Sequence, residues 1–128
     1  EHDLNVLIDL GVWWNDRTDG WPMPLGGNVV RRDLGQQVME DITLYTKMSI
    51  EHAIAHPADA LEFAKAWGRG IDDETNKEFV SMYVNNRTID YEDEGRSAVR
   101  QFIKEGQELG LIDSTFDTSS MKFIGSPE

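Results

Sequence analysis

Short apolar runs separated by turn-forming residues make up the first third of the chain. Leu4 to Asp9 is mostly apolar and β-branched, which predicts a buried strand. The next stretch, Leu10 to about Thr18, predicts a short helix capped by Asp9. Its neighbouring tryptophans, Trp13 and Trp14, point to different sides of such a helix, so we expect one to pack in a core.

A stiff, extended segment follows this helix. Two prolines within Trp21–Leu25 disfavour both helix and sheet, and Gly26-Gly27 allows unusual backbone angles or close approach of a ligand. Asn28 to Arg32 predicts a second short strand, and Asp33 is placed to cap the next helix. This order is typical of a hinge, where a chain passes from one lobe to another.

The rest of the chain has the periodicity of amphipathic helices. We expect them at about 34–55, 58–67, 72–85 and 91–109, followed by a loop at 113–120 and a short strand or docking segment at 121–124. The longest helix carries a regular apolar stripe, formed by Leu34, Val38, Ile42, Tyr45, Ser49 and Ala53.

Each of these helices needs a partner layer for its apolar face, and two or three short strands provide too little of one. The pattern therefore predicts part of an α/β protein, helix-rich with few strands, whose main sheet lies upstream of residue 1. A strand edge left unpaired invites association, so we expect the chain alone to be poorly stable or to associate.

The composition of the chain limits which classes of partner it is expected to bind. The 128 residues allow one domain, and the formal net charge of -12 argues against nucleic acid and anionic membranes as partners. With no cysteine, the chain has no disulfide, thiolate nucleophile or zinc–cysteine site.

No apolar run is long enough to span a bilayer, and the charged start indicates no signal peptide, which favours a cytoplasmic protein. The chain does not begin with methionine, so it is processed or excised from a longer polypeptide.

Candidate catalytic groups are few. His52 and His56 are four residues apart, with Asp59 nearby, but no glutamate follows His52, so we interpret them as surface or helix-end histidines rather than metal ligands. Arg31-Arg32 could bind an anion or simply end a strand. The acidic clusters at 72–74 and 92–94 match first-turn helix acids. No nucleophile, base and orienting group can be assembled, so the chain looks catalytically incomplete.

Several segments together resemble one family. They are Ile8-Asp-Leu-Gly-Val-Trp-Trp14, Pro22-Met-Pro-Leu-Gly-Gly27 and Val30-Arg-Arg-Asp-Leu-Gly35, and the likeness continues through 53–61, 82–85 and 94–96. This pattern is similar to the 1,4-dihydroxy-6-naphthoate synthase family of the futalosine route to menaquinone. The resemblance covers nearly the whole chain, which makes it more specific than any single short motif.

The resemblance implies a type 2 periplasmic-binding-protein-like fold of two α/β lobes. Residues 1–25 would end the second lobe and cross back, and residues 26–128 would supply a strand and helices covering the first lobe. The family's enzyme converts cyclic dehypoxanthine futalosine to dihydroxynaphthoate by a lyase-type proton abstraction, with no metal or organic cofactor expected. The residues placed to approach this small-molecule substrate are Pro24, Leu25, Gly26, Gly27 and Asn28.

The family's proton-accepting histidine belongs to an Ile-His-Glu-type segment upstream of the double-tryptophan helix. None of His2, His52 or His56 matches that segment. The chain is therefore interpreted as the C-terminal half of the enzyme, with the base supplied by an upstream half or a partner chain. Two alternatives stay open, a non-catalytic small-molecule binding module of the same architecture and the related chorismate dehydratase.

Overall fold

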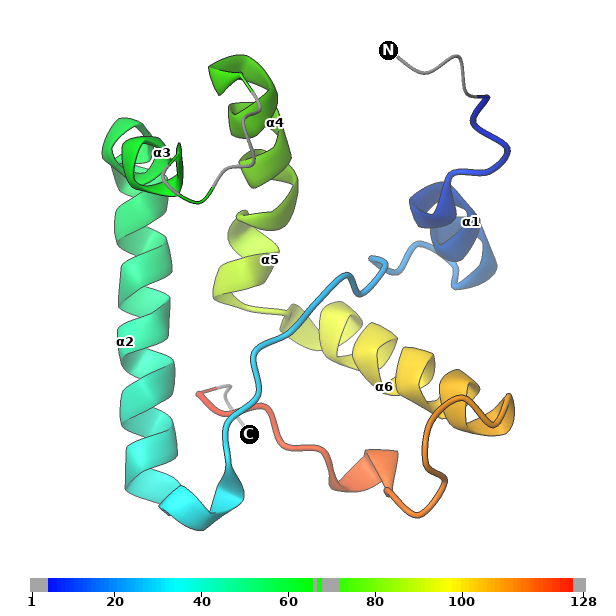
Figure 1. Ribbon diagram of the computed structural model, residues 1–128. Helices are drawn as coiled ribbons and strands as arrows, with labels where there is room; N and C mark the ends of the chain where they lie inside the picture. Colours follow the sequence, from blue (N-terminus) through cyan, green and yellow to red (C-terminus); the bar gives the residue numbers. More distant parts are fainter. Residues whose placement is uncertain (1–4, 66, 68–71, 126–128) are drawn as a thin grey trace. The chain divides into compact units, whose positions relative to one another are not determined.

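The computed structural model describes residues 5–65, 67 and 72–125, and Figure 1 shows them as helices joined by irregular segments. The elements, in chain order, are α1 Leu10–Arg17, η1 Arg32–Leu34, α2 Gln36–Ala55, α3 Pro57–Lys65, α4 Asp73–Tyr83, α5 Asn86–Ile89, α6 Glu92–Glu108 and η2 Thr118–Ser120, where η denotes a short 3-10 helix. None of the described residues lies in a strand. Nor does any helix among them combine the length and apolar character needed to cross a membrane.

The predicted α/β fold class is therefore wrong for this part of the chain. The runs predicted as strands have no regular hydrogen-bonded structure over residues 5–9 and 28–31, and Leu4 lies outside the described residues. Val6, Leu7 and Val29 are 87%, 95% and 98% exposed. Strand propensity expresses how well a side chain fits a pleated, half-buried surface, and these side chains have no such surface beside them.

Residues 121–124 do not form a strand either, but this segment does dock. The Arg100 guanidinium donates a hydrogen bond to the Met121 carbonyl oxygen, at 3.4 Å. Phe123 meets the ring of Tyr91 edge to face, with 5.9 Å between the ring centres. Of the two possibilities that the sequence left for this segment, a short strand and a docking segment, the structure shows docking.

Helix starts follow local capping chemistry at several predicted places. Asp9 accepts a hydrogen bond from the Val12 N–H at 3.0 Å, and Asp72 accepts one from the Thr75 N–H at 2.9 Å. Each bond satisfies an N–H that has no partner within its helix. Pro57 is the first residue of α3, where the lack of an N–H costs nothing. These three starts lie within one residue of the predicted positions.

The start of the long helix α2 differs from the prediction. Asp33 lies inside η1 and pairs with Arg31 instead of capping the long helix. Gly35, at a φ of 83°, is the residue before α2, and no side chain caps that helix. The α4 end also differs, because Asn85 starts the short helix α5 through a reciprocal capping box with Thr88.

The chain divides into two compact units. One comprises Glu1–Gly27 and Glu92–Lys122, and the other comprises Asn28–Tyr91 and Phe123–Glu128. In the first unit, Trp14 of α1 is 1% exposed and packs edge-on against Phe102 of α6, and Ala98 of α6 is fully buried. In the second unit, α2 contacts η1, α3 and α5, and α3 contacts α4. The correspondence between these units and the lobes expected from the sequence stays a prediction.

Candidate functional site

The segment predicted to approach a substrate lies in irregular, accessible backbone. Pro24 is half-buried, and the four residues after it, Leu25 to Asn28, are exposed. The chain passes from one compact unit to the other between Gly27 and Asn28. A Cβ added at Gly26 would meet no atom within 4 Å, so its backbone is open to close approach by another molecule.

One hydrogen bond ties the crossing segment, residues 22–28, to α1. The Trp14 indole N–H donates to the Pro22 carbonyl oxygen at 3.1 Å, and a buried indole needs such a partner. The crossing segment is therefore held at its proline end by the core of the first unit. Its role in binding substrate stays a prediction, because no ligand contact tests it.

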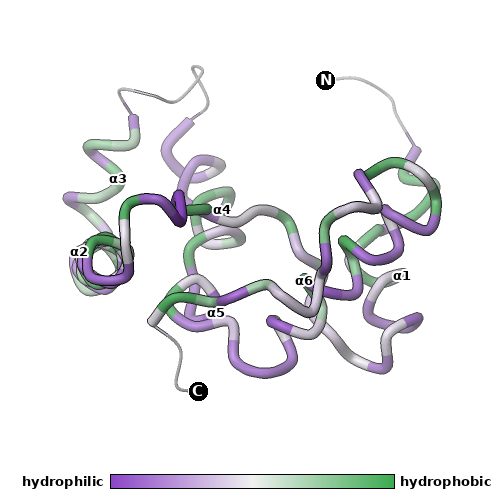
Figure 2. Tube along the Cα trace, turned by 90° about the horizontal axis from the view of Figure 1, so that it is seen from below, coloured by the Kyte–Doolittle hydropathy of each residue, from purple (hydrophilic) through white to green (hydrophobic). Residues whose placement is uncertain are grey.

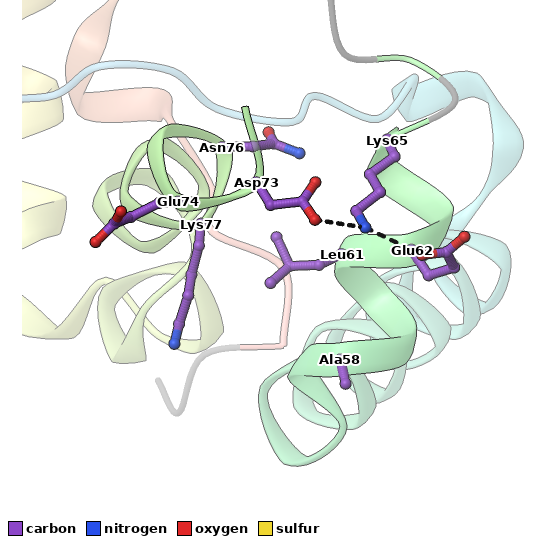
Figure 3. Close-up of a pocket in the computed structure, with 8 residues that line it drawn as sticks. All are labelled: Ala58, Leu61, Glu62, Lys65, Asp73, Glu74, Asn76 and Lys77. Atoms are coloured by element: carbon purple, nitrogen blue, oxygen red, sulfur yellow. Dashed lines mark ion pairs between the residues drawn. The ribbon is translucent and has the colours of Figure 1, made fainter. Parts of the chain in front are cut away.

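A cleft of about 460 Å³ lies between α3 and α4 (Figure 3). The Lys65 ammonium sits at its edge, 2.9 Å from an Asp73 carboxylate oxygen and 3.3 Å from one of Glu62. These two carboxylates, Asp73 foremost, raise the pKa of Lys65 above its ordinary value. Lys65 therefore stays charged and is unsuited to act as an amine nucleophile or base. The lining residues are Ala58, Leu61, Glu62, Lys65, Asp73, Glu74, Asn76 and Lys77.

Asn76 is the polar residue that the sequence reading missed. It is 6% exposed and lines the cleft, and within the part of the chain described here its side-chain amide makes no hydrogen bond. The sequence does contain a signal for Asn76. It lies four residues before Val80, so it falls on the apolar stripe of α4. Among the described residues no fully buried side-chain nitrogen or oxygen atom lacks a hydrogen-bond partner, so the unbonded amide atoms of Asn76 are accessible at the cleft.

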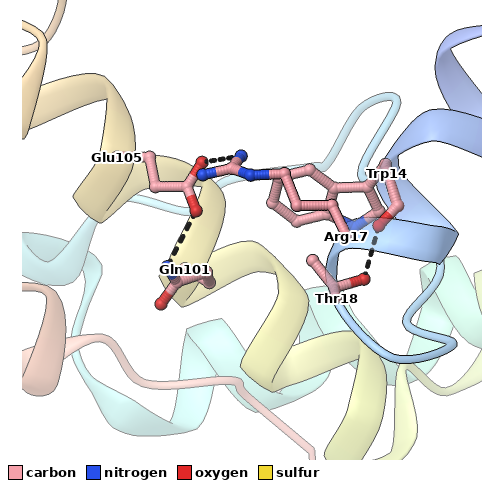
Figure 4. Close-up of polar contacts among 5 residues, drawn as sticks. All are labelled: Trp14, Arg17, Thr18, Gln101 and Glu105. Carbon is pink, nitrogen blue, oxygen red and sulfur yellow. Dashed lines mark hydrogen bonds and ion pairs between the residues drawn. The ribbon is translucent and has the colours of Figure 1, made fainter.

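Near the C-terminal end of α1, a network connects α1 to α6 (Figure 4). The Arg17 guanidinium lies 2.6 Å from a Glu105 carboxylate oxygen and 5.3 Å from the centre of the Trp13 ring. Gln101 donates to the other Glu105 oxygen at 2.8 Å. The Gln101 hydrogen bond, followed by that from Arg17, lowers the pKa of Glu105. A carboxylate stabilised in this way is a weak proton acceptor. We therefore interpret this network as a packing contact between α1 and α6 rather than as a catalytic group.

His52 and His56 come together at the end of α2. Their rings stack with 4.2 Å between centres, and Nδ1 of His56 lies 3.0 Å from the His52 carbonyl oxygen. Among the described residues no group of three or more possible metal ligands occurs, so Asp59 does not complete a metal site with the two histidines. A second, shallower depression at the C-terminal end of α1 is lined by Asn15, Asp16, Asp19 and Gly20.

Comparison with known proteins identifies the family. The family described as Menaquinone biosynthesis matches residues 1–108. A protein of Thermus thermophilus named 1,4-dihydroxy-6-naphtoate synthase is 37% identical over 110 residues, which is 86% of this chain and 40% of that protein. A Streptomyces coelicolor protein of the same name is 26% identical over 111 residues, 87% of this chain and 39% of its own length. No solved structure gives a significant match.

The chain therefore spans about two fifths of the length of these relatives. The resemblance seen in the double-tryptophan, proline-crossing and Arg-Arg-Asp segments is confirmed, since the family match includes all three. The match covers more than half of the chain, and the chain belongs to the menaquinone biosynthesis family.

Proposed function

We propose that this chain is part of a 1,4-dihydroxy-6-naphthoate synthase, acting in menaquinone biosynthesis. One observation carries the proposal, namely the 37% identity to a protein of that name over 86% of the chain. The reaction we propose is the lyase-type conversion of cyclic dehypoxanthine futalosine to 1,4-dihydroxy-6-naphthoate. Its small-molecule substrate contains no polyanionic backbone, which is compatible with a chain of formal net charge -12.

The catalytic base of the proposed reaction belongs to polypeptide outside this chain. Lys65, beside the cleft between α3 and α4, is paired with Asp73, and Glu105 of α6 is paired with Arg17. His52 and His56 stack on each other at the end of α2 and do not match the family's proton-accepting segment. This chain would then contribute scaffold and the crossing segment that approaches the substrate.

Product formation tests the proposal. Purified chain and the full-length protein containing it are each given cyclic dehypoxanthine futalosine, and dihydroxynaphthoate is followed by mass spectrometry. We expect product from the full-length protein and none from the chain. Product from the chain alone would place the base among the residues set aside here. Binding without turnover by the full-length protein would favour a non-catalytic binding module, and turnover of chorismate would favour the dehydratase.

The proposed role of the crossing segment has its own test in the full-length protein. Gly26→Ala adds a methyl group into open space, so the fold should tolerate it and the thermal midpoint should not change. If the substrate approaches this backbone closely, the methyl group should raise KM severalfold. An unchanged KM, with the variant fully folded, would remove Gly26 from the substrate site.

A further inference from the structure

The cleft between α3 and α4 contains a polar group that has no partner among the described residues. Asn76 is 6% exposed, and its side-chain amide makes no hydrogen bond within that part of the chain. Figure 3 shows this amide directed from α4 toward the α3 side of the cleft. A nearly buried amide without a hydrogen bond costs free energy, so native proteins rarely keep one unless another molecule bonds to it. The amide is therefore available to a molecule that enters the cleft.

The cleft has the size and the mixed lining of a small-molecule site. Its volume of about 460 Å³ lies within the range of roughly 300–1,000 Å³ that is typical of ligand pockets. Ala58 and Leu61 of α3 add apolar surface to the lining. Figure 2 shows hydrophobic as well as hydrophilic positions in both α3 and α4. Apolar surface together with a few polar groups is the usual composition of a site that binds a small organic molecule.

The charges around the cleft favour a neutral ligand. Carboxylates of Glu62, Asp73 and Glu74 line it, together with the ammonium groups of Lys65 and Lys77. Lys65 is already paired with Asp73 and Glu62, so it offers little attraction to an anion. An anionic ligand would also meet the field of a chain whose formal net charge is -12. An asparagine amide, in contrast, is uncharged and offers both a donor and an acceptor.

We propose that the cleft between α3 and α4 binds a small neutral molecule through a primary amide or a lactam, and that Asn76 recognises this group. Both groups present an N–H and a C=O on the same edge, with which one asparagine amide forms a pair of hydrogen bonds. A trans peptide bond directs its N–H and C=O to opposite sides, so a peptide backbone cannot form this pair. The apolar body of the ligand covers Ala58 and Leu61.

Nuclear magnetic resonance on the ¹⁵N-labelled full-length protein tests the proposal. The side-chain signal of Asn76 is assigned by its absence from the variant Asn76→Leu, in which an apolar side chain of similar shape replaces the unbonded amide. The probes are benzamide, a primary amide, and δ-valerolactam, a lactam. N-Methylbenzamide, a trans secondary amide, and benzoate, which is charged and has no N–H, are the matched comparisons. Asn86→Leu is the control variant, because Asn86 is exposed and does not line the cleft.

We expect benzamide and δ-valerolactam to shift the Asn76 signal with dissociation constants of about 1 mM or tighter. N-Methylbenzamide and benzoate should bind at least about fivefold more weakly, because each loses one of the two hydrogen bonds. Asn76→Leu, followed at the backbone signals of α3, should weaken benzamide binding by at least about the same factor, and Asn86→Leu should not change it.

Three results would overturn the proposal. They are no shift of the Asn76 signal with either probe, equal affinities for benzamide and N-methylbenzamide, and unchanged benzamide binding by Asn76→Leu. Binding of only one of the two probes would support the site and identify which of the two groups it takes. If Asn76→Leu does not fold, the comparison of benzamide with N-methylbenzamide on the wild-type protein decides. The readout needs no turnover, so it is independent of the proposed reaction.

Discussion

At the scale of single residues, Trp14 connects sequence, packing and the crossing segment. Its ring is almost fully buried against Phe102, with 5.6 Å between ring centres, while its N–H bonds to the Pro22 carbonyl oxygen. Its neighbour Trp13 is 43% exposed. The sequence predicted that the adjacent tryptophans would face different ways, but only packing against α6 decided which of them is inside.

Replacing Trp14 should therefore cost far more stability than replacing Trp13. Trp14→Ala is expected to lower the free energy of unfolding by about 3–5 kcal/mol, as for other buried aromatic residues, measured by urea denaturation. Trp14→Phe keeps most of the ring packing and loses the bond to Pro22, so it should cost less. Trp13→Ala, which loses the contact with Arg17, should cost about 1 kcal/mol. A larger loss for Trp13→Ala would contradict the packing described.

Glu105 should make stability depend on pH in the acid range. Hydrogen bonds from Gln101 and Arg17 lower its pKa in the folded state, so folding favours the ionised carboxylate. Its contribution is present above the unfolded pKa, ordinarily 4.5, and is lost as pH falls through the lower folded pKa. The stability difference between wild type and Glu105→Gln should therefore shrink below about pH 4.5.

Glu108→Gln is the control for this pH dependence, because Glu108 lies on the same helix but is exposed and is 3.8 Å from Lys104. The two differences are obtained from urea titrations between pH 3 and pH 7. A stability difference for Glu105→Gln that stays constant over this range would show that its carboxylate is not held in the ionised form by the fold.

At the scale of elements, the local sequence pattern predicted where the helices lie, but not which face of α2 is packed. Starts at Leu10, Pro57 and Asp73 depend on residues within one turn of each start. The apolar stripe of α2 was predicted along Val38 and Ile42, yet the structure packs the adjoining sector, which contains Met39, Thr43 and Ile50. Both sectors are apolar, so periodicity alone offers two solutions, and only the neighbours η1, α3 and α5 decide between them.

The contact between α2 and the C-terminal segment depends on a glycine. Gly125 has a φ of +77°, and a Cβ there would lie 2.9 Å from the Thr43 methyl carbon. Gly125→Ala should cost about 1–2 kcal/mol for the left-handed backbone, plus the cost of the contact. Gly110→Ala is the matched control, because Gly110 has a φ of +70° and no atom within 4 Å of an added Cβ.

Thr43→Ser should relieve part of this cost. It removes the methyl group but keeps the hydroxyl that donates to the Met39 carbonyl oxygen at 2.9 Å. The double variant Gly125→Ala with Thr43→Ser should then be destabilised about as much as Gly110→Ala, measured by thermal unfolding. Equal losses for the Gly125→Ala and Gly110→Ala single variants would show that the Thr43 contact has no energetic weight.

At the scale of the whole molecule, each compact unit has its own aromatic contact. Trp14 and Phe102 belong to the first unit, and Phe123 with Tyr91 to the second. Proteins open locally in cooperative groups, so the two units should open with different free energies.

Trp14→Ala should consequently speed amide hydrogen exchange in α1 and α6 more than in α2 to α4. The comparison is made by mass spectrometry on wild type and variant under native conditions. A uniform increase over all helices would mean that the chain opens as a single cooperative body. Trp13→Ala serves as the control and should speed exchange in α1 and α6 much less than Trp14→Ala does.

The sequence by itself determined most helix positions, the cap at Asp9, and the family, because each depends on residues close together in the chain or on motifs read in order. Only the tertiary structure decided the rest. Arg17 and Glu105 are 88 residues apart, and no local pattern pairs them. The apolar runs at 5–9 and 28–31 read as strands, but strand formation requires a partner, and none lies beside them in the described chain.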